Sequence, residues 1–357
     1  MLFLAKFLAR MKISKTPKSR IDSIDFSNLP FGKYFADHML VCHFRNGAWE
    51  EPEILPFGQV NFTYGLHALH YGQAAFEGLK AYRTVDGGVS IFRPADNFKR
   101  LNRSAERLLM PQVPEEISME GLKKLIELDR EWVPNAPDHS LYIRPFLFSS
   151  SEFIAARPSE DYTFVIITSP VGPYYSGAVK VKVEDQYTRA TGGGIGFTKA
   201  AGNYGGAFYP TAKAIEEGFN QVIWTDHKEH AYIEESGTMN VMVRIGDKMM
   251  TPPLSDRILA GITRDSILKL CGDLGLEVEE RRISVQEIVD AARAGNLNEM
   301  FGMGTAAVVS QINALGYHGE IFDVPTPTDG FAMQIKKGLN DIRTGAAEDK
   351  YGWMVHL

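Results

Sequence analysis

Two short turn signals, each between strand-like runs, constrain the first half of this chain most strongly. Asn46 and Gly47 divide the run HMLVCHFRNGAWEE, and the triplet 86–88 (Asp-Gly-Gly) divides GLKAYRTVDGGVSIFRP. Asn-Gly and Asp-Gly pairs accept the positive φ angles of tight turns, so both segments predict β-hairpins. Antiparallel hairpins this early in the chain argue against a strictly alternating, purely parallel α/β fold.

Helical segments follow these hairpins. In residues 95–110, ADNFKRLNRSAERLLM, apolar residues recur at helical spacing, and residues 118–133 predict a second helix with Ser118 as its N-cap. Later strand-like runs and helices mix without strict βαβ alternation. The sequence therefore predicts an α+β, or mixed α/β, protein.

The length of 357 residues favours two domains. The segment PVGPYYSGA is rich in Pro and Gly and predicts an inter-domain connector at residues 171–178. We therefore expect a basic leader at 1–20, a smaller N-terminal α/β domain at 21–170 and a larger C-terminal domain at 179–357. The leader carries six basic residues and no acid. It is either an organelle-targeting peptide, or an unstructured leader or upstream start ahead of Met11, and we favour the second interpretation.

Composition excludes several classes of function. The net charge of −6 argues against nucleic-acid binding, and the chain has no run of eighteen apolar residues that would span a membrane. Cys42 and Cys271 lie far apart, which suits a reducing cytoplasm and excludes a disulfide framework or a cysteine zinc site. The nine histidines show no HExxH spacing, so no metal site is predicted.

A glycine-rich segment, GIGFTKAAGNYGG at 194–206, contains a single lysine, Lys199. It is no Walker loop, because GxxxxGK[ST] is absent. The run GMGTAA at 302–307 matches GxGxxA and predicts a strand entering a turn whose N–H groups suit a phosphate. Lys199 itself suits Schiff-base chemistry, since small and aromatic neighbours disfavour the charged ammonium. The alternative is an ordinary surface lysine near a turn.

A pyridoxal phosphate enzyme also needs an anion beside the pyridine nitrogen and donors for the phosphate. The run YIEESGTMNVMV supplies Glu234 and Glu235 in a strand-like setting. Taken alone, such an acidic pair is more often solvated than buried.

Together these segments resemble the fold-type IV (class IV) pyridoxal phosphate enzymes, and the N-terminal half is similar to the branched-chain amino acid aminotransferases. The similarity extends from about residue 22 to the C-terminal WMVHL. The segments that carry it are FGKYFADHM (31–39), LHYGQAAFEGLKAY (69–82), IFRPADNFKRLNRSAERL (91–108), SLYIRPFL (140–147), GNYGG after Lys199, EESGTMN (234–240), LAGITR (259–264) and FGMGTA (301–306).

The resemblance implies a two-domain fold with pyridoxal 5′-phosphate between the domains, the larger C-terminal domain being the cofactor-binding one. Lys199 would bind the cofactor covalently and move the proton between Cα and C4′. Glu235 would pair with the pyridine nitrogen and Tyr204 with the phenolic oxygen, whereas Glu234 has no assigned role. The phosphate would be bound by Arg93, Ile262, Thr263 and Thr305.

The resemblance also implies a pocket that accepts both an aliphatic side chain and that of glutamate. Arg144 would receive the glutamate side-chain carboxylate, and Thr238 and Ala306 would bind the α-carboxylate. The apolar wall would comprise Phe31, Tyr71, Phe76, Tyr142 and Tyr174. The alternative for each aromatic residue is core packing.

The sequence thus predicts a cytoplasmic, homodimeric branched-chain amino acid aminotransferase that exchanges amino groups between Leu, Ile or Val and 2-oxoglutarate by a ping-pong cycle. The nearest alternatives are a D-amino acid or amine transaminase, or aminodeoxychorismate lyase, on the same fold. A nicotinamide oxidoreductase built on GMGTAA and a non-catalytic binding protein are more distant ones. Some relatives carry CxxC after GTA; here Ala307 and Ser310 stand there, so no thiol switch is expected.

Overall fold

The computed structural model describes residues 11–175 and 177–357, and the chain divides into two compact units. The first unit comprises the chain through Tyr174 together with Thr198–Gly202 and Arg343–Leu357, and the second comprises Tyr175–Phe197 and Asn203–Ile342. The first boundary falls inside the predicted connector at 171–178.

Two segments depart from the predicted division, which assigned all of 179–357 to one domain. Thr198–Gly202 belongs to the first unit, where Ala200 forms an isolated β-bridge with Ala75. The C-terminal strand β19 (Met354–His356) also belongs there, because it pairs antiparallel with β7 (Val89–Phe92). Backbone pairing between segments far apart in sequence overrides the simple two-part division.

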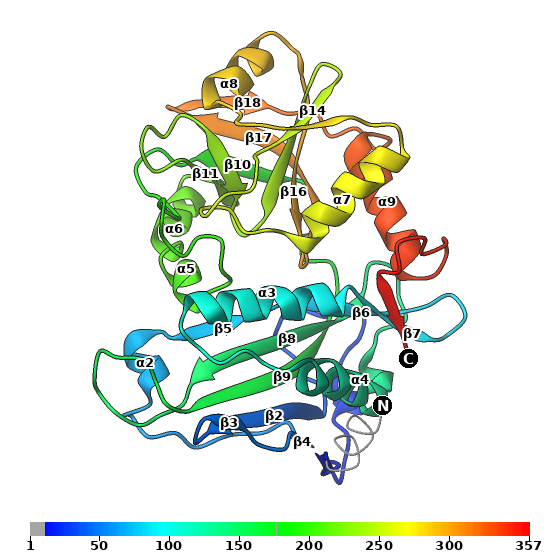
Figure 1. Cartoon of the computed structure of the whole chain (residues 1–357). Coiled ribbons are helices and arrows are strands. Elements are labelled where there is room, and N and C mark those ends of the chain that lie inside the picture. Colours follow the sequence, from blue (N-terminus) through cyan, green and yellow to red (C-terminus); the bar gives the residue numbers. More distant parts are fainter. Residues whose placement is uncertain (1–10, 176) are drawn as a thin grey trace. The chain divides into compact units, whose positions relative to one another are not determined.

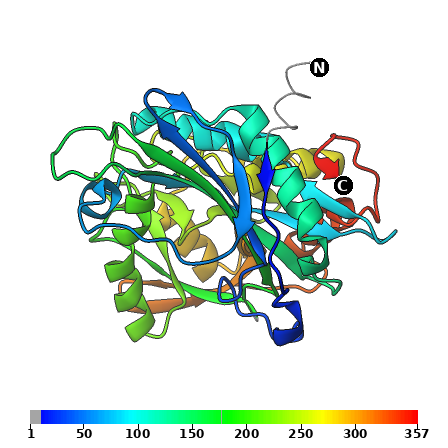
Figure 2. The same cartoon turned by 90° about the horizontal axis from the view of Figure 1, so that it is seen from below.

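A mixed, mainly antiparallel sheet forms the first unit, with ten strands among the described residues. Strands β2, β9 and β8 run side by side across it, as Figures 1 and 2 show in blue and green. The order is β1 (Lys12–Ile13), β4 (Glu53–Pro56), β2 (His38–Arg45), β9 (Tyr162–Val171), β8 (Ser140–Ser149), β6 (Leu79–Arg83), β7 and β19, with β3 (Ala48–Trp49) on β2 and β5 (Ala74–Phe76) on β8.

Both predicted hairpins are confirmed. Asn46 and Gly47 connect β2 to β3 with φ angles of 52° and 76°. The second turn connects β6 to β7, where Gly87 has a φ of 83°. Positive φ angles explain why the sequence uses Asn and Gly at these turns.

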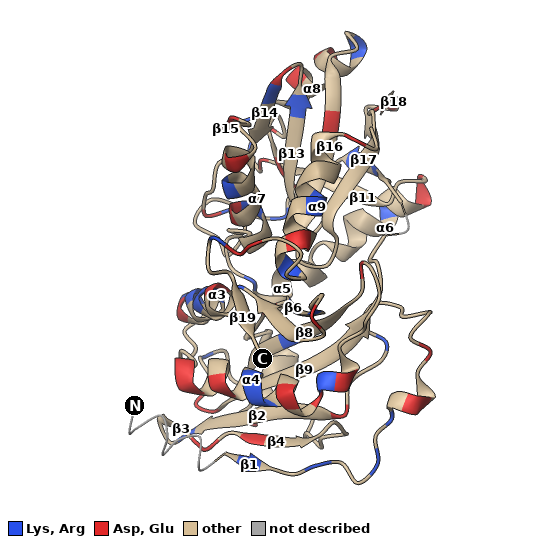
Figure 3. Cartoon of the chain, turned by 90° about the vertical axis from the view of Figure 1, so that its right-hand side faces the viewer, with Lys and Arg blue, Asp and Glu red and all other residues tan. Residues whose placement is uncertain are grey.

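The helical segments of this unit are η1 (Ile21–Ser23), α2 (His67–Tyr71), α3 (Pro94–Arg107), η2 (Glu116–Glu120), α4 (Gly121–Leu128) and η3 (Arg130–Trp132). The predicted N-cap at Ser118 is wrong, because the π-helical segment η2 begins two residues earlier and the Ser118 hydroxyl donates to the carbonyl of Pro114. Leu101 of α3 and Leu125 of α4 enter one core with the strands. Lys123 and Lys124 of α4 form ion pairs with Glu120 of η2 and Glu127 of α4. Figure 3 shows charged residues on α4.

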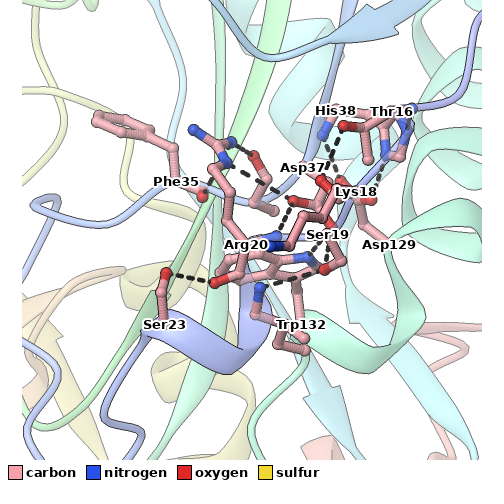
Figure 4. A network of polar contacts seen from close by, with 12 residues as sticks. Thr16, Lys18, Ser19, Arg20, Ser23, Phe35, Asp37, His38, Asp129 and Trp132 are labelled. Atoms are coloured by element: carbon pink, nitrogen blue, oxygen red, sulfur yellow. Dashed lines mark hydrogen bonds and ion pairs between the residues drawn. The ribbon is translucent and has the colours of Figure 1, made fainter.

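The N-terminal segment is anchored to this sheet (Figure 4). Residues 1–10 of the predicted leader lie outside the described residues. The expectation of an unstructured leader is corrected for residues 11–20, because β1 pairs with β4 and the backbone N–H of Thr16 donates to Nε2 of His38 at 2.9 Å. Since Nε2 accepts, the Nδ1 of His38 carries the proton and donates to buried Asp129 at 2.6 Å.

Asp37 binds the end of the N-terminal segment, at Ser19 and Arg20. Its carboxylate accepts hydrogen bonds from the Ser19 hydroxyl at 2.5 Å, the Arg20 N–H at 3.0 Å and the Trp132 indole at 3.0 Å. Burial raises the pKa of Asp37, but these hydrogen bonds and the Arg20 charge outweigh burial and hold that pKa below its ordinary value. The N-terminal segment is therefore fixed by a charged acceptor.

The second unit contains a mixed sheet with nine strands among the described residues. The order is β12 (Ile233–Ser236), β11 (Gln221–Thr225), β10 (Val179–Val183), β17 (Val308–Tyr317), β16 (Leu297–Gly304), β13 (Asn240–Ile245), β14 (Lys248–Thr251) and β15 (Val278–Glu280), with β18 (Glu320–Asp323) on β17. The helices are α6 (Phe208–Glu216), α7 (Ile262–Asp273), α8 (Val285–Arg293) and α9 (Phe331–Arg343); α5 (Ala201–Gly205) crosses the unit boundary.

Branched apolar side chains fill the core of the second unit. Val181, Val243 and Ile312 of the sheet pack in one cluster with Ile288 of α8. Ser284 caps α8 by accepting from the N–H of Glu287. The mixed α+β class predicted from the sequence is confirmed in both units. Among the described residues, no helix is long and apolar enough to cross a membrane.

Candidate active site

Lys199 is held in the first unit through both polar groups of its own backbone. Its N–H donates to the hydroxyl oxygen of Ser104 at 3.0 Å, and its carbonyl accepts from the N–H of Phe76 at 3.1 Å. The Nζ atom lies 4.8 Å from the centre of the Phe76 ring. The lysine therefore has a fixed backbone, and its amine lies over an aromatic face.

Aromatic rings and one arginine continue from Phe76. The Arg144 guanidinium lies 4.4 Å from the centre of the Phe76 ring, and its Nη2 donates to the Tyr142 hydroxyl at 3.0 Å. Phe31 contacts Tyr142 and Tyr174 with centroid distances of 4.8 and 4.9 Å. Five of the predicted substrate residues thus lie in one connected cluster with Lys199, which we call the aromatic cluster (Phe31, Phe76, Tyr142, Arg144, Tyr174 and Lys199).

Strand β8 explains this arrangement. Tyr142 and Arg144 are two residues apart, so they project from the same face of the strand. Gly78 makes room for the tyrosine, because a Cβ there would lie 2.2 Å from the Tyr142 hydroxyl. Partial burial raises the pKa of Tyr174, with Tyr142 adding to the effect, so its phenol stays protonated at neutral pH.

Arg144 has a buried donor that the described part of the chain does not satisfy. Its Nε is buried and has no hydrogen-bond partner among the described residues. A buried donor without an acceptor is costly, so an acceptor brought by a substrate would be favoured at this position. The carboxylate of a substrate is an acceptor of the required charge.

Tyr71 lies apart from the other predicted wall residues. It occupies α2, is 41% exposed and contacts the rings of His67 and His70. Among the described ring contacts of the first unit, none joins Tyr71 to the aromatic cluster. The structure therefore brings together five of the six predicted substrate residues of this unit.

Arg93 begins helix α3 in an unusual conformation. Its φ is 49°, in the left-handed region, and its side chain is only 8% exposed. The Nε donates to Asp96 at 2.7 Å, and the guanidinium lies 5.4 Å from the centre of the Trp353 ring. A non-glycine residue in this region is strained and is retained when its surroundings fix it, which occurs most often at functional sites.

In the second unit, Glu235 is a buried carboxylate surrounded by donors. One oxygen lies 2.6 Å from Arg189 Nη2, and the other accepts from Asn240 Nδ2 and the Leu259 N–H, both at 3.1 Å. The adjacent Glu234 is also buried, and it pairs with Arg257 at 2.6 Å. The two neighbouring acids are therefore held by different arginines.

Asn240 links the Glu235 carboxylate to the loop that precedes α7. Asn240 also donates to the Leu259 carbonyl at 2.9 Å, and a Cβ on the N-cap residue Gly261 would lie 2.0 Å from the Asn240 amide oxygen. The N-cap residue Gly261 makes no side-chain cap, and the first residues of the helix are the predicted phosphate ligands Ile262 and Thr263. A helix N-terminus favours an anion through its N–H groups and its dipole.

Two turns carry three more predicted residues of this unit. Thr238 lies between β12 and β13, and Thr305 and Ala306 lie between β16 and β17. The start of β13 pairs with the end of β16, so both turns lie at the same end of the sheet. Val308 follows the second turn with a φ of 62°, a strained angle for a β-branched residue.

Tyr204 lies in the short helix α5, where its carbonyl accepts from the N–H of Ala207. Two functional candidates were missed from the sequence. Arg189 is 10% exposed and pairs with Glu235, and Asn240 joins that carboxylate to the loop before α7. The need of a buried carboxylate for a countercharge could have indicated an arginine, although not which one.

Comparison with known proteins agrees with these observations. Residues 74–315 match the family Amino-transferase class IV. The chain is 43% identical over 99% of its length to a probable branched-chain-amino-acid aminotransferase of Staphylococcus epidermidis, covering 98% of that protein. It is 43% identical over 93% of its length to the branched-chain-amino-acid transaminase 1 of Bacillus subtilis, covering 95% of that protein.

Solved structures agree in fold. A branched-chain amino acid aminotransferase of Escherichia coli superposes with a TM-score of 0.73 at 26% identity, covering 89% of this chain and 98% of that one. The T.th. branched-chain amino acid aminotransferase, complexed with N-(5′-phosphopyridoxyl)-L-glutamate, gives 0.69 at 25% identity, covering 88% and 97%. The chain belongs to the class IV aminotransferases and, within them, to the branched-chain-amino-acid aminotransferases.

Proposed function

We propose that this chain transfers the amino group between L-leucine, L-isoleucine or L-valine and 2-oxoglutarate in a ping-pong cycle, with pyridoxal 5′-phosphate bound through Lys199. The observation that carries the proposal is the aromatic cluster. It combines the lysine amine, an apolar surface of rings and one arginine with an unsatisfied buried donor. An enzyme that alternates between aliphatic and acidic side chains needs these three features.

The residues of the chain fit the cofactor. Glu235 supplies a buried carboxylate, suited to hold a proton on the pyridine nitrogen, and Arg189 and Asn240 fix its orientation. The N-terminus of α7, with glycine as its N-cap residue, suits the phosphate, as does the guanidinium of Arg93. Tyr204 would donate to the phenolic oxygen. When bound, the cofactor supplies an electron-withdrawing ring that stabilises negative charge at the substrate Cα.

Different residues would transfer the proton and orient the substrate. Lys199 would hold the cofactor, and its amine, once released, would take up and return a proton at the substrate Cα. Phe76 lies 4.8 Å from the amine and would limit its movement and its contact with water. The turns that carry Thr238 and Ala306 would hold the α-carboxylate, which sets the orientation of the Cα proton toward the base.

Substrate choice follows from the same cluster. Phe31, Tyr142 and Tyr174 offer ring faces and edges to an aliphatic side chain. One methylene in such a wall changes binding by about 1–3 kcal/mol, so Leu, Ile and Val are all accepted. Arg144 would bind the side-chain carboxylate of glutamate or 2-oxoglutarate through its fork of donors.

We further propose a cytoplasmic homodimer that requires neither a membrane nor nucleic acid. The support for self-association is a group of exposed apolar side chains on and before α2: Val60, Phe62, Tyr64, Leu69 and Tyr71. Exposed apolar patches of this kind mark interaction surfaces. Sedimentation velocity tests the proposal, because a monomer at micromolar concentration would contradict it.

The absorbance spectrum of the purified protein tests the proposed activity. We expect a yellow band that L-leucine removes and 2-oxoglutarate restores, and no such band for Lys199→Ala. A band that responds to D-alanine, an amine or aminodeoxychorismate but not to L-leucine would move the substrate to another enzyme of the same fold. No band after addition of pyridoxal phosphate would refute the proposal.

A further inference from the structure

We propose that Ser104 is a positioning residue for Lys199, and that helix α3 uses Ser104 and Arg100 to fix the lysine backbone and the strand beneath its amine. The inference rests on the proposed function, because it concerns the base of that reaction. All of the groups involved lie in the first unit, where α3 and β5 are in contact (Figure 1).

The hydrogen bonds of Ser104 define its role. The side chain is buried, with 1% exposure, and the hydroxyl lies 3.1 Å from the carbonyl of Arg100 and 3.0 Å from the N–H of Lys199. A carbonyl can only accept and an N–H can only donate, so the hydroxyl proton points to Arg100 and its lone pair receives Lys199. Both capacities of one hydroxyl are therefore used, and the lysine N–H is satisfied by a side chain of α3.

Ser104 lies inside the helix, where it is a less favourable choice than alanine. Serine has a lower helix propensity than alanine, and its back-bond to the carbonyl four residues earlier slightly destabilises and bends a helix. The hydroxyl thus reduces the local stability of α3. The hydrogen bond to Lys199 is the compensating interaction that the structure offers.

The other side of Lys199 is held by β5. Its carbonyl accepts from the Phe76 N–H at 3.1 Å, and the next residue, Ala200, bridges to Ala75. The Phe76 ring lies under the amine with 4.8 Å between Nζ and the ring centre. The strand that carries Phe76 therefore sets both the backbone and the amine of the lysine.

The same helix fixes that strand. Glu77 follows Phe76, has 0% exposure and forms two hydrogen bonds with Arg100, Nε to Oε1 at 2.7 Å and Nη2 to Oε2 at 2.8 Å. The Glu77 N–H donates to the Pro145 carbonyl at 2.7 Å. Arg100 and Ser104 are one helical turn apart and so share a face of α3. One face of α3 therefore fixes both the backbone of Lys199, through Ser104, and the strand that carries the Phe76 ring, through Arg100 and Glu77.

This arrangement predicts how a small loss affects the reaction. A base that is misplaced by about 1 Å costs on the order of 100-fold in rate. Ser104→Ala removes one hydroxyl, frees the lysine N–H and improves the helix, so we expect a folded protein with a displaced amine. We expect the substitution to change kcat, the amide exchange of Lys199 and the titration of the yellow band, and to leave substrate affinity nearly unchanged.

Ser118 provides a matched control. It is also 1% exposed, and its hydroxyl also donates to the carbonyl four residues earlier, that of Pro114 at 3.1 Å. Within the described part of the chain, its hydroxyl bonds only the carbonyls of Pro114 and Glu115 and not Lys199. Ser104→Ala is compared with Ser118→Ala and with Ser104→Thr, which keeps a hydroxyl able to bond the same carbonyl.

Two measurements decide the proposal. In the full-length protein without cofactor, the Lys199 amide should exchange hydrogen at least about 10-fold faster in Ser104→Ala than in the wild type or Ser118→Ala. In the loaded enzyme, Ser104→Ala should lower kcat about 10- to 100-fold with little change in KM for L-leucine, and shift the pH at which the yellow band titrates. Ser104→Thr should restore part of both effects.

The outcomes separate this proposal from the proposed function. If the wild type shows no yellow band, the proposed function fails, while the exchange measurement still tests the hydrogen bond from Lys199 to Ser104. If the band forms and Ser104→Ala matches Ser118→Ala in exchange, kcat and band titration, the positioning role is overturned. Should Ser104→Thr fold poorly, the comparison between the two alanine variants still decides.

Discussion

Replacement of Arg144 by methionine should separate the two half-reactions of the enzyme. Methionine keeps a long, flexible apolar chain over the Phe76 ring but removes the guanidinium. The wild-type group donates to Tyr142 through Nη2 at 3.0 Å and has a buried Nε without a partner among the described residues. A carboxylate of 2-oxoglutarate would satisfy that donor, whereas the side chain of leucine would not.

The magnitude follows from the charge of the bond. Hydrogen bonds between charged groups contribute about 1.5–3 kcal/mol, and each 1.4 kcal/mol corresponds to a factor of ten. We therefore expect Arg144→Met to lower kcat/KM for 2-oxoglutarate by about 10- to 150-fold. The value for L-leucine should change by less than about threefold, because the rings of Phe31, Tyr142 and Tyr174 remain.

Rapid-mixing absorbance measures each half-reaction separately, with L-leucine consuming the yellow band and 2-oxoglutarate restoring it. Arg157→Met is the matched control, since the Arg157 guanidinium also covers a ring, that of Phe153 at 4.2 Å, on an exposed part of the same unit. It should change neither rate. An equal loss in both half-reactions of Arg144→Met would refute the reasoning, because it would assign Arg144 a structural role.

Three further predictions concern stability. Asp37→Asn should lower the free energy of unfolding by about 3 kcal/mol at pH 7, because the carboxylate accepts three hydrogen bonds. Folding lowers the pKa of Asp37, so the difference from the wild type should persist above about pH 4 and shrink as acid protonates the folded group. Urea titrations from pH 3 to 7 that show a constant difference would contradict this prediction. Glu77→Gln should cost about 3 kcal/mol, since it leaves the Arg100 guanidinium without its buried countercharge; a loss under about 1 kcal/mol in urea unfolding would show that the charge is dispensable. Leu101→Ala should lower the free energy of unfolding by about 2–5 kcal/mol, because Leu101 is fully buried in the core of the first unit. Leu109→Ala, at a 70% exposed position, should lower it by less than about 0.5 kcal/mol. Similar melting temperatures of the two variants would contradict the assignment of Leu101 to the core.

Local features of the fold could be predicted from the sequence. The two hairpins follow from Asn-Gly and Asp-Gly, whose conformational preferences act within four residues. Helix α3 follows from its apolar spacing and was predicted to within a few residues at each end. The start of the next helix could not be predicted, because the Ser118 hydroxyl satisfies a helical carbonyl instead of capping the helix.

Long-range features were not predictable from local patterns. Nothing near β19 indicates that it pairs with β7, and the five residues around Lys199 join the first unit through contacts with distant segments. In the candidate site, family resemblance indicated Glu235, but its partner Arg189 lies 46 positions earlier and depends on the folding of the whole second unit. Side-chain pairs of this kind result from tertiary packing rather than from periodicity.

The pairing of β19 with β7 has a consequence for the synthesis of the protein on the ribosome. The N–H of Arg93 donates to the Trp353 carbonyl at 2.8 Å, and the Arg93 guanidinium lies over the Trp353 ring. A ribosome adds Trp353 after it has made every residue of the second unit. During translation, the nascent first unit therefore has an open sheet edge at β7 and an uncovered Arg93. The proposed phosphate-binding arginine acquires its final surroundings only when synthesis reaches β19.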